Sequence, residues 1–86
     1  MTADPWTLQR AMFIWEIDID RRRWSISLEH DTAKAQVHLL CGCRHVATFV
    51  SILGRNETRT SVSGWPDVVR HKFLEVCKNA EKSVVQ

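Results

Sequence analysis

Alternating apolar and polar residues in two neighbouring stretches limit the fold of this chain more than any other feature. In residues 12–20 one side is apolar and the other acidic: Phe13, Trp15, Ile17 and Ile19 against Glu16, Asp18 and Asp20. In the next stretch, Trp24, Ile26 and Leu28 alternate with Ser25, Ser27 and Glu29. A period of two is typical of a strand with one buried face. With Arg21 and Arg22 as a tight connection, the two stretches predict a β-hairpin.

Residues 33–53 allow two interpretations. Alternation from Ala33 to Cys41 predicts a strand, whereas apolar residues at helical spacing recur from Leu39 to Leu53. Gly42 would cost a helix about 1 kcal/mol relative to alanine. β-Branched residues also recur at every second position in 46–52, as in strands. We therefore expect two strands broken at Gly42. The alternative is a helix over 32–53, which would give a hairpin plus two or three helices.

The ends of the chain carry helix signals. Asp4-Pro5 is an N-cap followed by a proline at the first helical position, and it predicts a short N-terminal helical turn. Residues 54–57 predict a turn and residues 58–62 a short edge strand. Trp65-Pro66 then opens a C-terminal helix. Its apolar positions share one face: Val69, Phe73, Val76, Cys77, Ala80 and Val84.

The combined prediction is a single small α+β domain over residues 1–86. Four to five short strands form an antiparallel meander, and the C-terminal amphipathic helix covers it, because only a sheet offers its apolar stripe a matching face. At 86 residues the chain has room for one core.

Charge and cysteine usage limit the cellular compartment in which the protein is expected. The net charge is only +2, with an acidic first third and a basic middle. An odd number of cysteines, three, argues against a disulfide framework. No apolar run reaches the roughly 18 residues of a membrane span. Without a basic N-terminal region typical of a secretory signal, we expect a cytoplasmic protein that makes no membrane contact.

Two groups of side chains suggest a protein partner. Glu16, Asp18 and Asp20 would project from one strand face and could dock a basic surface. Trp6 and Trp65, beside the expected helix starts, would be half exposed and could anchor an interface. The partner is unidentified, and a second copy of the chain is one candidate.

A third group suggests nucleic acid. Basic residues beside an aromatic ring can hold a phosphate backbone and stack a base. Arg21, Arg22 and Arg23 precede Trp24, and the strands could add Arg44, Arg55 and Arg59.

Cys41, Cys43 and His45 are the weak candidates for metal ligands. On one strand they would share a face, and thiolates and imidazoles bind zinc. Structural zinc sites, however, usually separate paired cysteines by two to four residues. We therefore predict no metal and no cofactor. With no nucleophile elbow or orienting acid, we also predict no enzymatic activity.

The leading hypothesis is a small non-enzymatic binding or regulatory protein that docks onto another protein, such as a phage-type inhibitor or adaptor. The alternative is a single-stranded DNA- or RNA-binding module. A strand meander followed by one helix occurs in both groups, but shared topology alone does not assign function.

Overall fold

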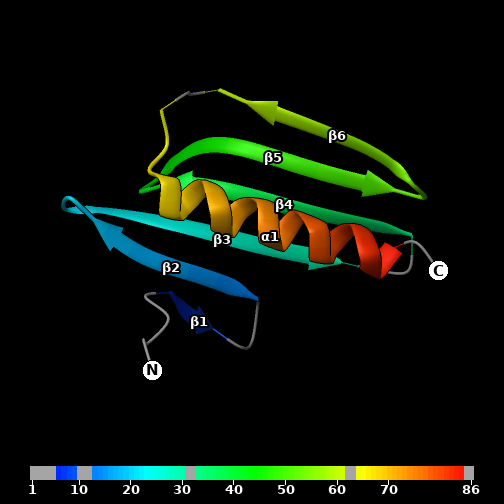
Figure 1. Ribbon diagram of the computed structural model, residues 1–86, viewed down its shortest axis with the longest axis horizontal. Helices are drawn as coiled ribbons and strands as arrows, with labels where there is room; N and C mark the ends of the chain where they lie inside the picture. Colours follow the sequence, from blue (N-terminus) through cyan, green and yellow to red (C-terminus); the bar gives the residue numbers. More distant parts are fainter. Residues whose placement is uncertain (1–5, 10–12, 31–32, 62–63, 85–86) are drawn as a thin grey trace.

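The computed structural model describes residues 6–9, 13–30, 33–61 and 64–84. They form one six-stranded antiparallel sheet whose strands follow chain order, with a single helix lying across one face (Figure 1). The elements are β1 (Thr7–Gln9), β2 (Ile14–Ile19), β3 (Arg22–His30), β4 (Lys34–Cys41), β5 (Arg44–Ile52), β6 (Arg55–Thr60) and α1 (Asp67–Val84). The α+β meander covered by a C-terminal helix is confirmed, but its described part has six strands rather than the expected four to five, because Thr7–Gln9 add a strand beside β2.

The two strands expected on either side of Gly42 are confirmed, whereas the alternative helix over 32–53 and the N-terminal helical turn are not. Thr7–Gln9 pair with β2 as a short strand, so the N-terminal helical turn is absent from these residues, while positions 1–5 and 10–12 lie outside the described part. Residues 34–52 form β4 and β5 rather than a helix. Gly42 lies in the turn between them with a φ of 63°, a conformation that interrupts a helix and suits glycine.

In the described part of the chain, three hairpin turns join consecutive strands, at residues 20–21, 42–43 and 53–54. Asp20 and Arg21 have φ values of 51° and 65°, as a two-residue turn with the sheet's twist requires. Leu53 and Gly54, at 47° and 84°, make the same kind of connection between β5 and β6. The turn predicted over 54–57 is therefore misplaced. Its last three residues already belong to β6, which begins at Arg55.

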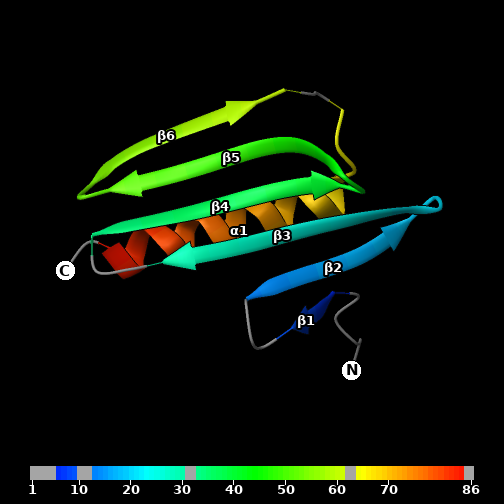
Figure 2. The same cartoon turned by 180° about the vertical axis from the view of Figure 1, so that it is seen from behind.

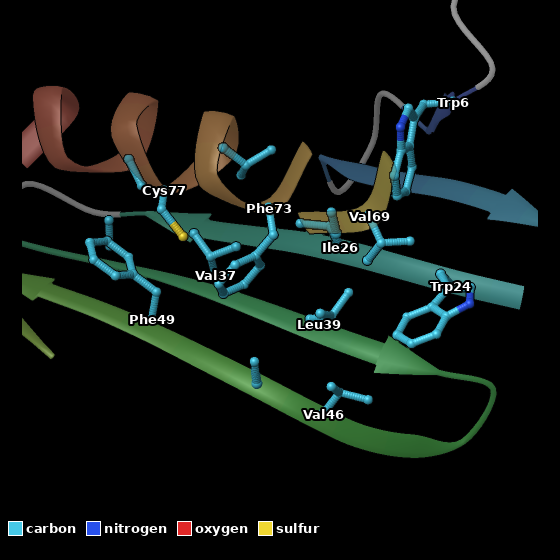
Figure 3. Packing of buried hydrophobic residues seen from close by; sticks show 14 residues of the cluster. Trp6, Trp24, Ile26, Val37, Leu39, Val46, Phe49, Val69, Phe73 and Cys77 are labelled. Carbon is cyan, nitrogen blue, oxygen red and sulfur yellow. The ribbon is translucent and has the colours of Figure 1, made fainter. Parts of the chain in front are cut away.

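The core lies between the sheet and the helix. α1 packs on β4 and also contacts β3 and β5. Figure 2 shows the opposite face, which we call the outer face; no described element covers it. The predicted helix stripe is confirmed wherever side chains are described, since Val69, Phe73, Val76, Cys77 and Ala80 are all buried. Figure 3 shows Val69, Phe73 and Cys77 of α1 facing buried residues of the strands, among them Trp24, Ile26, Val37, Leu39 and Phe49.

One irregularity interrupts the β4–β5 ladder. Leu39 pairs with Ala47 and Leu40 pairs with His45, which leaves Val46 as an extra residue in β5. Such a bulge places two successive side chains toward the same layer. Val46 and Ala47 are accordingly 2% and 1% exposed. The bulge thus brings Val46 into the core at the end of the sheet.

Candidate functional site

A hollow of about 430 Å³ lies at the end of the sheet where β2 turns into β3 and β4 turns into β5. Figure 1 shows both turns at the same end of the molecule. Four arginines line the hollow, together with residues of the two turns and the core: Arg21, Arg22, Arg23, Trp24, Cys41, Gly42, Arg44 and Val46. We call this site the arginine hollow. It joins a basic run near residue 22 to a single arginine about twenty positions later.

The local backbone holds the two turns against each other. The N–H of Gly42 donates a 2.7 Å hydrogen bond to the carbonyl oxygen of Arg23. Trp24 and Val46 are buried and form an apolar floor, while the arginines at the rim are exposed. Planar guanidinium groups above a firm floor suit the bidentate binding of phosphate or carboxylate oxygens.

The charges at the rim are unevenly neutralised. Arg23 forms ion pairs with Asp18 at 3.0 Å and Glu16 at 3.8 Å. Hydrogen bonding to Asp18 raises the pKa of the Arg23 guanidinium. Arg21, Arg22 and Arg44 have no carboxylate partner among the described residues. Three positive charges at the hollow therefore remain available to an anion.

The acidic strand is less acidic than its sequence suggests. Glu16 and Asp18 lie on the outer face of β2, opposite Ser25 and Arg23. The side-chain hydrogen bond from Arg23 lowers the pKa of Asp18. Asp20 lies in the β2–β3 turn rather than in the strand. The three carboxylates thus do not form one unopposed negative face.

The two candidate tryptophan anchors are largely enclosed. Trp6 is only 9% exposed, so the prediction that it is half exposed is wrong. Trp65 is partly buried and stacks edge-on against Phe73, with 5.4 Å between ring centroids. Both rings contribute to packing around the core.

The remaining basic candidates lie elsewhere. Arg55 is opposite Ile52, about 27 Å from Arg44 along β5. Arg59 lies on the same strand as Arg55 and forms a 2.8 Å ion pair with Glu57. Neither of these β6 arginines lines the arginine hollow.

The cysteine and histidine candidates are also separated. Cys41 is partly buried and packs against the core, whereas Cys43 is exposed in the β4–β5 turn. His45 pairs with Leu40 on the outer face, where its Nε2 lies 2.7 Å from Thr48 Oγ1. The inference that the three share one strand face is wrong, because the turn reverses the chain at Gly42 and Cys43. No group of three metal-ligating side chains occurs in the described part of the chain.

No family model matches this chain, and neither a curated protein nor a solved structure matches it. In the described part of the chain, α1 is too polar to serve as a membrane-crossing segment. The functional argument therefore rests on the arginine hollow and on the surfaces around it.

Proposed function

We propose that the protein is a non-enzymatic module that binds single-stranded nucleic acid through its phosphates at the arginine hollow. The observation that supports this function is the grouping of Arg21, Arg22 and Arg44 around one hollow with no carboxylate partner among the described residues. Phosphate contacts from arginine supply most of the affinity of sequence-independent binding.

The buried floor limits the kind of contact. Trp24 is 7% exposed, so its ring offers little surface for base stacking. The guanidinium groups at the rim would contact the backbone and leave the bases outside. Binding through phosphates carries little sequence information, so we expect oligonucleotides of different sequence to bind with similar affinity.

Fluorescence anisotropy with a labelled oligothymidine tests the proposal. The logarithm of the association constant should fall linearly with the logarithm of salt concentration, with a slope of about −0.7 for each phosphate contact on a single strand. Arg22→Ala and Arg44→Ala should each weaken binding, and each should make the salt slope shallower by roughly one contact.

Arg55→Ala is the matched control, since it removes the same charge at an exposed site about 27 Å from Arg44. It should leave the salt slope unchanged. Equal losses in the Arg44 and Arg55 variants would mean that net charge, and not the arginine hollow, attracts the oligonucleotide. Absence of binding at about 50 mM salt would reject the proposal outright.

Docking onto a protein is the second candidate, and the uncovered outer face of the sheet favours it (Figure 2). Partly exposed apolar residues, Leu40 and Val50, lie there among polar neighbours. On this alternative, Val50→Arg should abolish binding of a protein partner while Arg44→Ala should not. Loss of binding in Arg44→Ala but not in Val50→Arg would instead support binding at the arginine hollow.

A further inference from the structure

β6 is an edge strand that is exposed along its whole length. It pairs with β5 on one side, and no described strand lies on the other. The N–H of Ser61 donates to the carbonyl oxygen of Val46, so the odd-numbered backbone groups face β5. In an antiparallel ladder the alternate residues then face outward. The free edge therefore presents the N–H and C=O groups of Asn56, Thr58 and Thr60.

This edge lacks most of the features that usually prevent pairing. Proteins protect edge strands with charged side chains, lysine above all, and with proline, bulges or very short strands. β6 has six residues, contains neither proline nor lysine, and pairs with β5 in a regular register. Its charged residues, Arg55, Glu57 and Arg59, alternate in sign along the outer face. A strand of the right charge pattern could therefore pair with it.

We infer that a second copy of this chain pairs with β6 along this edge, antiparallel and with Thr58 on the two-fold axis. Thr58 then faces Thr58 of the second copy, and Asn56 faces Thr60. All of these are residues with outward backbone groups, so the pairing forms about six hydrogen bonds. Glu57 of each copy faces Arg59 of the other at a non-hydrogen-bonded position, where side chains lie closest.

Charge and geometry select this register over its neighbours. A shift by one residue would place opposite faces of the two strands side by side, which pleating forbids. Centring on Glu57 would oppose two glutamates and also set Arg55 against Arg59. Centring on Arg59 would oppose two arginines. Like charges directly opposite each other destabilise a sheet.

The register centred on Asn56 also fails. It would pair Arg55 with Glu57, but Thr58 would then face Gly54. Gly54 and Leu53 form the β5–β6 turn with positive φ values, so they cannot extend the ladder. Of the registers centred on Asn56, Glu57, Thr58 and Arg59, the Thr58-centred one satisfies both the backbone groups and the charges. Its sheet would be continuous, with both copies of α1 on the same face.

A charge-exchange experiment tests this pairing. Sedimentation equilibrium should show a concentration-dependent dimer for the parent chain, since a small edge interface gives weak association. Glu57→Arg would place two arginines opposite each other in both cross-strand pairs, and Arg59→Glu would place two glutamates there. Each variant alone should be monomeric. When mixed in equal amounts they should form a heterodimer, because both cross-strand pairs are then oppositely charged.

Any other pattern overturns the inference. A parent chain that stays monomeric at millimolar concentration shows that the edge does not pair. Single variants that dimerise as the parent does show that the interface lies elsewhere. A mixture that stays monomeric shows that the charges do not meet in this register. Circular dichroism of each variant checks that the sheet has formed.

Disulfide trapping tests the position of the two-fold axis. In a background with Cys41→Ser and Cys43→Ser, Thr58→Cys should cross-link under mild oxidation, since hydrogen-bonded partners have Cα atoms about 5.5 Å apart. Thr60→Cys is the control, because the two copies of residue 60 would be about 13 Å apart. Cross-linking of the Thr60 variant at the same rate would overturn the proposed register.

Discussion

The Nε of Arg23 lies 3.0 Å from Oδ1 of Asp18, the residue directly opposite it in the β2–β3 ladder. The same guanidinium reaches Oδ2 of Asp18 at 3.4 Å and Glu16 at 3.8 Å. The sequence suggests that the acidic strand and the basic run form separate binding surfaces. In the structure, ion pairs through Arg23 partly neutralise both of them. The arginines of the hollow that have no carboxylate partner among the described residues, Arg21, Arg22 and Arg44, are therefore a stronger charged feature than the acidic strand.

Replacing Arg23 with alanine should raise the pKa of Asp18 toward its ordinary value, because the hydrogen bond from Arg23 is the main cause of its lowering. A lowered folded-state pKa contributes stability above the unfolded pKa, and that stability disappears as pH falls through the folded value. The pair is exposed, so the effect on stability should be small. A carboxyl NMR titration of both proteins measures the shift, and identical Asp18 midpoints would contradict the assignment.

Arg21→Gly should make the protein more stable but a weaker nucleic-acid binder. Arg21 has a φ of 65°, and a left-handed conformation costs a residue other than glycine about 1–2 kcal/mol. Urea denaturation should show part of that gain, while anisotropy should show lost affinity. Arg22→Gly is the control: it lies within β3, where glycine weakens a strand. If Arg21→Gly is the less stable of the two, the turn is not strained.

Phe73→Ala should destabilise the domain by about 3–5 kcal/mol, because it leaves a cavity under the helix. Phe73 is 2% exposed and contacts the ring of Trp65. The neighbouring Leu74 is 52% exposed, so Leu74→Ala should cost much less. Thermal denaturation of the two variants compares them directly. Equal losses would show that α1 does not pack as described.

Cys77 should react with thiol reagents only after unfolding, whereas the exposed Cys43 should react at once. Burial raises the pKa of the Cys77 thiol from 9.0 to about 12. A raised folded-state pKa gives stability that is complete below the unfolded pKa and is lost as pH rises toward the folded value. Stability should therefore fall between about pH 9 and 12, and Cys77→Ala should remove that part of the decline. An unchanged pH profile in the variant would contradict the assigned pKa.

The sequence predicts most of the fold because its strands and helix have clear periods. The alternation around Trp15 and Trp24 and the helical spacing around Phe73 both predict which side is buried. The start of β6 is not predictable in this way, because all of its side chains are exposed and leave no alternation to detect. The turn before it contains Leu53 with positive φ, a position where sequence patterns favour glycine.

The candidate site is only half predictable for a different reason. Arg21 and Arg22 stand next to each other in the sequence, but Arg44 joins them because β4 pairs with β3 on one side and with β5 on the other. The separation of Cys41 from His45 likewise depends on the place of the turn. A local motif predicts neither the grouping of the arginines nor the separation of Cys41 from His45, because both depend on which residues pair across the hairpins.

The extra residue in β5 has a consequence for how the chain tolerates changes in length. Deleting Val46 would leave Leu39 opposite Ala47 and Leu40 opposite His45, so every other side chain would keep its face. The loss would comprise the buried Val46 side chain in the floor of the arginine hollow and the hydrogen bonds that its carbonyl oxygen accepts from Ser61. Deleting Thr48 instead would shift the pairing of β5 by one residue on one side of the deletion. The side chains there would turn to the opposite face, and their apolar members would be exposed. Val46 is thus a position at which β5 can lose one residue while its other side chains keep their alternation between the buried and the outer face.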